Sequence, residues 1–201
     1  MNTVEHIVES YFRLCRRCFT YTDVKVHRGN NRQVDLLAVS LESGEVAQQY
    51  HIECSVVPHK QWWRSCEELK ADFDKKFLGI PPKRSGLRTD SGRGKTYGGN
   101  IRVTHQLLGF DLRKTMNWVW ICWAVKDPEN LPRLYTDYHL QKGIKTEVIS
   151  FRDAILPGLM ETVSTANYDD EALRTFSLIK EWKQQLQKPM TEGPGRLCCH
   201  E

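Results

Sequence analysis

Three strand-like segments stand close together in the first third of the chain, and their spacing constrains the fold more than any other feature of the sequence. They cover residues 22–27, 33–41 and 49–57. Short turns that contain Gly or Asn join them, as β-hairpins require. The sequence therefore predicts an antiparallel meander, which needs further elements to cover its apolar residues.

The segments on both sides of the meander carry their own periodic patterns. Apolar residues recur at helical spacing over residues 3–18 and 62–77, which predicts a helix in each place. Residues 117–125 are apolar on both faces and predict a central strand, and residues 145–150 predict another strand.

Two further helices are expected near the C-terminus. One begins with the capping-box pattern of Ser150 and Asp153 and bends at Pro157. The other begins at Asp169 and Asp170. A strand meander flanked by helices indicates an α/β or α+β sandwich with a mixed sheet.

The length of 201 residues predicts one domain with appendages. The expected divisions are a domain at 1–165 with a basic, Gly-rich loop insertion at 79–102, an amphipathic C-terminal helix at 166–188, and a disordered tail at 189–201.

Composition argues against membrane and secreted proteins. The longest apolar run, near residues 118–125, is far shorter than the roughly 20 residues of a membrane span. Glu5 and Glu9 stand where a signal peptide would have its apolar core. The seven cysteines then indicate reduced thiols in a cytoplasmic or nuclear protein. The net charge of +4 permits a nucleic-acid partner without indicating one by itself.

Two acidic residues lie inside strands that otherwise have the pattern of buried strands. Asp35 interrupts the apolar second strand, and Glu53 lies in the third. A buried carboxylate is costly unless it is paired or binds a metal. If the two strands are neighbours, the carboxylates meet at one end of the sheet, and such hard oxygen ligands suit Mg²⁺ or Mn²⁺. The alternative is a solvent-facing position or an ion pair, with Lys25, Lys60 or His51 as the partner.

The order of these features resembles the PD-(D/E)XK nuclease superfamily. A helix with Glu5 and Glu9 precedes the strand with Asp35, and Glu53 stands two positions before Ser55 in the following strand. A helix then follows, as it does in that superfamily.

The resemblance covers residues 3–77 and extends to the strand and helix within 117–163. It implies a restriction-endonuclease-like three-layer sandwich, in which a central mixed β-sheet is flanked by helices. The helix at 166–188 would be an addition at the C-terminus.

The resemblance also implies an endonuclease that hydrolyses phosphodiester bonds of DNA with one or two divalent ions, Mg²⁺ or Mn²⁺. The metal ligands would be Asp35, Glu53, the backbone carbonyl of Cys54 and a helix glutamate, for which Glu9 is preferred over Glu5. Bound metal lowers the pKa of a water molecule and offsets charge in the transition state.

The lysine of the superfamily motif is replaced by Ser55 in this chain. Loss of one transition-state donor costs about 3–4 kcal/mol. A lysine from elsewhere would have to supply the charge, or the protein is slow or inactive. Lys60 is the preferred substitute, and Lys70 and Lys25 are alternatives.

A basic, Gly-rich stretch at 82–102 suits the binding of phosphates along a nucleic-acid strand. An ordinary surface loop is the alternative. The candidate contacts are Lys83, Arg84, Arg88, Arg93, Lys95 and Arg102.

Other motifs carry weaker signals. Cys15 and Cys18 form a CxxC pair that, with Cys198, Cys199 and His200, would suit zinc, but their place on an apolar helix stripe favours packing. Gly94-Lys95-Thr96 lacks the earlier glycine and the preceding strand of a Walker A loop, which argues against an ATPase.

The sequence leaves three functions open. The first is a metal-dependent nuclease that acts on DNA, for which a homodimer would supply the two sites that double-strand cutting needs. The second is a module of the same fold that has lost catalysis and binds nucleic acid through its basic loop. The third is a protein-interaction subunit that uses its C-terminal helix.

Overall fold

A computed structural model provides the structure of the chain. It describes residues 2–28, 32–59, 63–78, 91–111, 116–143 and 145–187, without the side chains of 91–98 and 141–142. The predicted tail at 189–201 lies outside the described residues.

A five-stranded mixed sheet forms the centre of the molecule, with its strands in chain order. The strands are β1 (Cys18–Lys25), β2 (Gln33–Glu42), β3 (Glu45–Ser55), β4 (Met116–Cys122) and β5 (Lys145–Ser150). β1, β2 and β3 pair antiparallel, whereas β3, β4 and β5 pair parallel. The predicted meander and the predicted mixed sheet are therefore confirmed.

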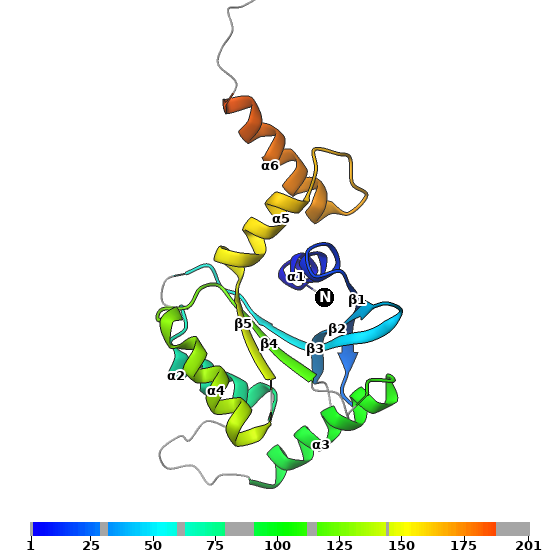
Figure 1. Ribbon diagram of the computed structural model, residues 1–201, viewed down its shortest axis with the longest axis vertical. Helices are drawn as coiled ribbons and strands as arrows, with labels where there is room; N and C mark the ends of the chain where they lie inside the picture. The colour runs from blue at the N-terminus through cyan, green and yellow to red at the C-terminus, as the bar shows by residue number, and fades with distance from the viewer. Residues whose placement is uncertain are drawn as a thin grey trace, which may run out of the picture.

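Helices cover both faces of the sheet, which makes an α/β fold in layers (Figure 1). One face carries α1 (Thr3–Leu14) and α5 (Leu156–Thr162), and the other carries α2 (Cys66–Lys76) and α4 (Leu131–Lys142). The 3₁₀ turn η2 (Pro128–Asn130) precedes α4, and the π-helical turn η3 (Phe151–Ile155) leads into α5.

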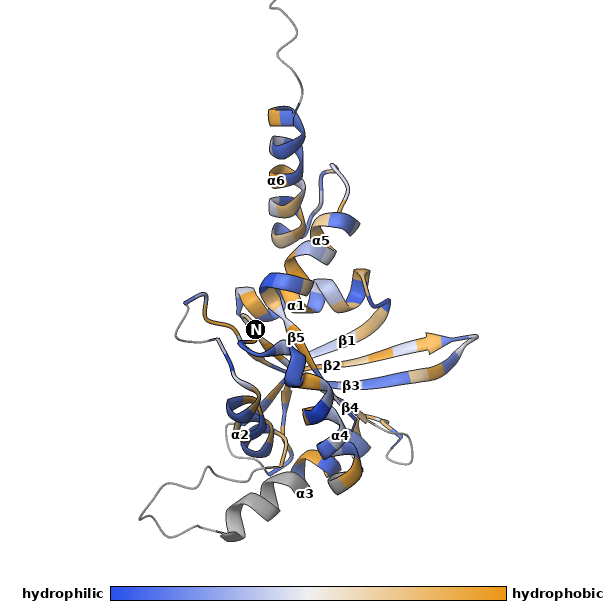
Figure 2. Cartoon of the chain, turned by 60° about the vertical axis from the view of Figure 1, so that its left-hand side comes forward, coloured by the Kyte–Doolittle hydropathy of each residue, from blue (hydrophilic) through white to orange (hydrophobic). Residues whose placement is uncertain are grey.

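The C-terminal helix α6 (Glu171–Gln187) is the outermost element (Figure 2). It packs against α1 and α5 near its N-terminal end and then extends away from the sheet (Figure 1). Within the described ranges, no helix is both long and apolar enough to cross a lipid bilayer.

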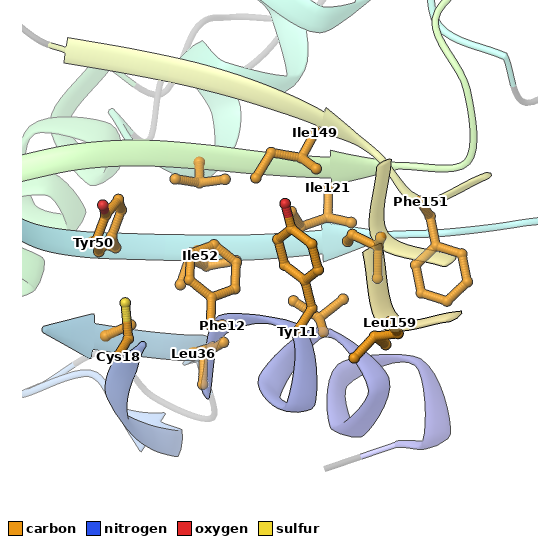
Figure 3. Close-up of a cluster of buried hydrophobic side chains, with 14 of the residues drawn as sticks. Tyr11, Phe12, Cys18, Leu36, Tyr50, Ile52, Ile121, Ile149, Phe151 and Leu159 are labelled. Carbon is orange, nitrogen blue, oxygen red and sulfur yellow. The ribbon is translucent and has the colours of Figure 1, made fainter. Parts of the chain in front are cut away.

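The larger apolar core lies between the sheet and α1 with α5 (Figure 3). Phe12 and Leu159 approach from the helices, and Ile52 and Ile121 approach from β3 and β4. Because β4 is covered on both faces, it is apolar almost throughout, as buried parallel strands usually are.

A second core lies between the opposite face and α2 with α4. Phe73 and Phe77 of the α2 segment pack against Trp120, which is 2% exposed, and Tyr138 of α4 packs against Phe73. The capping box of Ser65 and Glu68 starts α2. This core holds α2 firmly over the end of β3.

The first helix is shorter than predicted. It ends at Leu14, and Arg17 takes a left-handed backbone conformation with φ of 55° before β1 begins at Cys18. A helix cannot continue through such a residue, so Cys18 belongs to a strand and not to the helix stripe.

A helix occupies part of the region predicted as the loop 79–102. Residues 91–107 form α3 (Ser91–Leu107), whereas residues 79–90 lie outside the described part of the chain. Buried Ile101, Thr104 and His105 hold the helix, and the Thr104 hydroxyl accepts the backbone N–H of His27 at 2.8 Å. Tertiary contacts thus outweigh the low helix propensity of its glycines.

The helix α4 was not predicted, although its pattern is present. Leu131, Leu134 and Tyr138 recur at helical spacing, and Gly143 ends the helix in a left-handed conformation with φ of 63°. Its polar composition obscured this apolar stripe.

Candidate functional site

The two acidic residues singled out in the strands face each other. The paired register of β2 and β3 reaches Leu36 and Ile52, and Asp35 and Glu53 are the next residues on the two strands, in the position of an opposed pair. Directly opposed side chains lie on one face of a sheet, with Cβ atoms roughly 5 Å apart. The structure therefore brings the predicted carboxylates together.

The electrostatics of Asp35 reflect this closeness. Burial raises the pKa of Asp35 to about 6, and the negative charge of Glu53 acts in the same direction. The backbone N–H of Cys54 donates to Oδ2 of Asp35 at 2.7 Å, which favours the charged form. A cation beside Asp35 would favour the charged form that burial and Glu53 oppose.

Glu53 is buried and has a partner on each oxygen. Its side chain is 1% exposed. Nζ of Lys76 lies 2.9 Å from Oε2, and Nε2 of His51 lies 3.1 Å from Oε1. Burial raises the pKa of Glu53 above its ordinary value, and the charge and hydrogen bond of Lys76 oppose that rise.

Pairing with His51 was one of the alternatives that the sequence left open, and the structure confirms it. Burial lowers the pKa of His51 to about 3, and the charge of Lys76 acts in the same direction. His51 is therefore neutral at physiological pH and interacts with Glu53 as a hydrogen-bond partner.

Lys76 was not among the lysines considered from the sequence. Lys25 and Lys70 are exposed on β1 and α2, and Lys60 lies outside the described residues. Lys76 ends α2, seven residues after the buried Leu69. Since seven residues are close to two helical turns, this spacing places Lys76 on the sheet-facing side of α2. This seven-residue spacing is the sequence signal that could have identified Lys76.

Cys54 and Ser55 end β3 beside the two carboxylates. Burial and the nearby charges of Asp35 and Glu53 raise the pKa of the Cys54 thiol well above its usual value. A thiol that stays protonated is a poor nucleophile. Ser55 is half-buried at the last position of the strand.

The glutamates of α1 have different surroundings. Glu9 accepts a hydrogen bond from the Thr20 hydroxyl at 2.8 Å and lies 3.5 Å from Nδ1 of His6. Glu5 forms the capping box with Asn2, yet its charge acts on Asp35. The charge of Glu5 thus acts weakly on Asp35, whereas Glu9 is bonded to Thr20.

The metal donors that Asp35 and Glu53 offer are carboxylate oxygens. Among the described residues no group of three or more His, Cys, Asp or Glu side chains is placed to hold a metal ion. Asp35 and Glu53 supply two neighbouring carboxylates at the end of β3. Hard oxygen donors with excess negative charge fit Mg²⁺ or Mn²⁺, which keep several waters and use one or two carboxylates.

The predicted nucleic-acid contacts are described only in part. Arg102 is exposed on α3, and Arg93 and Lys95 lie on the same helix without described side chains. Lys83, Arg84 and Arg88 lie outside the described residues.

The two tryptophans of β4 serve packing. Trp118 stacks on Phe77 with ring centroids 5.0 Å apart, and Trp120 is buried. The ring of Trp63 is covered by the Arg152 guanidinium at 4.4 Å, and Trp62 is not described. The core role predicted for Trp118 and Trp120 is confirmed.

The CxxC pair also has packing surroundings. Cys15 contacts the Thr162 hydroxyl at 3.4 Å, and the Cys18 thiol lies against the Arg16 carbonyl at 3.5 Å. Burial raises the pKa of Cys18 to about 11. The tail residues of the zinc hypothesis, Cys198, Cys199 and His200, lie outside the described residues.

Comparison with known proteins adds no further constraint on this site. No family model, curated protein or solved structure matches the chain.

Proposed function

We propose that the chain is a divalent-metal-dependent nuclease of restriction-endonuclease-like fold that hydrolyses phosphodiester bonds of DNA. The observation that carries the proposal is the contact between Lys76 and Glu53 at 2.9 Å, beside Asp35. It supplies a lysine ammonium at the carboxylate pair, which Ser55 could not supply.

The order of elements agrees with the resemblance on which the proposal rests. A helix precedes three antiparallel strands, and the two acidic residues lie on the second and third of these. The helices α2 and α3 then follow before a parallel strand. The carboxylates lie where β3 ends, next to the side chain of Lys76, which is 41% exposed.

The residues divide the chemistry between them. Asp35, Glu53 and a main-chain carbonyl would hold a divalent cation, which would lower the pKa of an attacking water and offset phosphate charge. Lys76 offers a positive charge to the non-bridging phosphate oxygens, because its side chain lies at the boundary between core and solvent. Glu53 keeps Lys76 in place.

A cleavage assay tests the proposal. Plasmid DNA, single-stranded DNA and RNA are incubated with the protein in Mg²⁺, Mn²⁺ or EDTA. We expect cutting of DNA that requires metal, that Asp35→Asn abolishes, and that Lys76→Met slows by about 10²–10³-fold. Lys70→Met is the matched control on the same helix and should cut normally.

Three results would contradict the proposal. Cutting in EDTA, or equal cutting by Asp35→Asn, would show a contaminating or different activity. DNA binding without cutting would favour a nuclease-fold binding module. Neither binding nor cutting would favour a protein-interaction subunit. Thermal unfolding of each variant shows whether lost activity reflects lost structure.

A further inference from the structure

The most deeply buried polar side chain beside the carboxylate pair is that of His51, which the proposed function leaves without a role. It is 0% exposed and lies on the central part of the sheet, where β3 is flanked by β2 and β4. Burial of an imidazole is costly unless its polar atoms have partners. The polar partner of the ring is Glu53, whose Oε1 lies 3.1 Å from Nε2 of His51.

The surroundings of His51 indicate which ring nitrogen carries the proton. Nδ1 has no hydrogen-bond partner in the described part of the chain. A proton on Nδ1 would leave a buried N–H unpaired and would turn the Nε2 lone pair toward the Glu53 carboxylate. The neutral ring therefore has its proton on Nε2 and donates it to Oε1 of Glu53.

Aromatic neighbours prevent the ring from turning away. Phe77 lies edge-to-face with ring centroids 4.8 Å apart, His105 lies nearly perpendicular at 5.2 Å, and Trp118 lies at 6.2 Å. Close packing of this kind leaves one side-chain rotamer without strain. His51 is therefore a donor of fixed direction, whereas Lys76 is partly exposed and longer.

We propose that His51 is a positioning residue that orients the Glu53 carboxylate toward the divalent cation, an inference that rests on the proposed function. A carboxylate oxygen has two lone pairs, so Oε1 accepts from His51 and retains a site for a metal. Partners that orient metal ligands in this way are typically worth 10–100-fold in affinity.

A matched pair of substitutions tests the donor role. Glutamine and methionine have similar length and volume, but only glutamine has an N–H near the position of Nε2. Binding of Mn²⁺ is measured by titration calorimetry. We expect His51→Met to weaken binding by about 10–100-fold and His51→Gln to restore it to within about 3-fold of the wild type.

His105→Met is the control for damage to packing. His105 is 3% exposed and contacts the His51 ring, but no hydrogen bond joins it to Glu53 in the described structure. This variant should bind Mn²⁺ as the wild type does. Equal binding by the wild type and His51→Met, or a loss in His105→Met as large as in His51→Met, would overturn the role of His51.

Mn²⁺ binding by the wild type and by His51→Met separates the role of His51 from the proposed nuclease function. A wild-type protein that binds no Mn²⁺ would overturn both, whereas normal binding by His51→Met would overturn only the His51 assignment. Nitrogen-15 NMR of the histidines in the wild-type protein supplies a test that needs no variant to fold. We expect the Nε2–H tautomer for His51, with a shift of that signal when Mg²⁺ is added; the Nδ1–H tautomer would contradict the proposal.

Discussion

The negative charge of Asp35 lowers the free energy of unfolding. Its pKa rises from an ordinary value of 3.8 to about 6 in the folded protein. The folded state therefore binds the proton more tightly than the unfolded state, and this contribution to stability is complete below about pH 4 and is lost as the pH rises through 6.

A neutral substitute for Asp35 should reverse this effect. In EDTA at pH 8, we expect Asp35→Asn to raise the free energy of unfolding by about 2–3 kcal/mol, because each pKa unit corresponds to about 1.4 kcal/mol. The gain should vanish near pH 4. Urea unfolding at both pH values measures it, and a variant that is less stable than the wild type at pH 8 would show that Asp35 is paired rather than repelled.

At the scale of elements, the packing of α2 determines where Lys76 lies. Phe73 is 0% exposed and packs on Trp120 and Tyr138, three residues before Lys76. Phe73→Ala should lower the free energy of unfolding by about 3–5 kcal/mol, because it opens a cavity in this core.

A control for this substitution is available on the neighbouring helix. Leu140 of α4 is 77% exposed, and Leu140→Ala should change stability by less than about 0.5 kcal/mol. Chemical unfolding measures both variants. Similar losses in the two would contradict the described burial of α2.

The sequence predicted the elements whose periodicity is strong and missed those that depend on tertiary contacts. Strands β2 and β5 were expected almost at their observed bounds, because apolar runs and turn residues mark both. The sequence predicted a loop where α3 begins, because the glycines there disfavour a helix. The helix is held by tertiary contacts that the sequence does not show, such as those of His105 with His51 of β3 and of Thr104 with His27 after β1.

The sequence predicted the two carboxylates of the candidate site but not its lysine. Asp35 and Glu53 stand out as charges within apolar strands, and the register brings them together as expected. Lys76 did not stand out, because the sequence does not reveal which of several helix lysines meets the sheet. The choice between Glu9 and Glu5 likewise depends on the orientation of α1 over β2 and β3, which the sequence does not give.

At the scale of the molecule, α6 is joined to the body through its N-terminal half. Phe176 is 8% exposed within the larger core, and the Lys180 ammonium donates to the carbonyl of Val163 at 2.6 Å. Further along, Trp182 and Leu186 are 58% and 67% exposed.

This difference along α6 gives a direct prediction. Phe176→Ala should lower the free energy of unfolding by about 3–5 kcal/mol, whereas Trp182→Ala should change it by less than about 0.5 kcal/mol. Urea denaturation checks both values. A large loss in Trp182→Ala would show that the exposed half of α6 is covered in solution.

Our proposal requires that Asp35 and Glu53 hold one divalent cation. Anomalous diffraction from crystals grown with Mn²⁺ tests it most directly. We predict a manganese peak about 2.0–2.3 Å from an oxygen of each carboxylate, absent from crystals of Asp35→Asn. Wild-type crystals that bind Mn²⁺ elsewhere, or that show the Glu53 oxygens bonded only to Lys76 and His51, would contradict it.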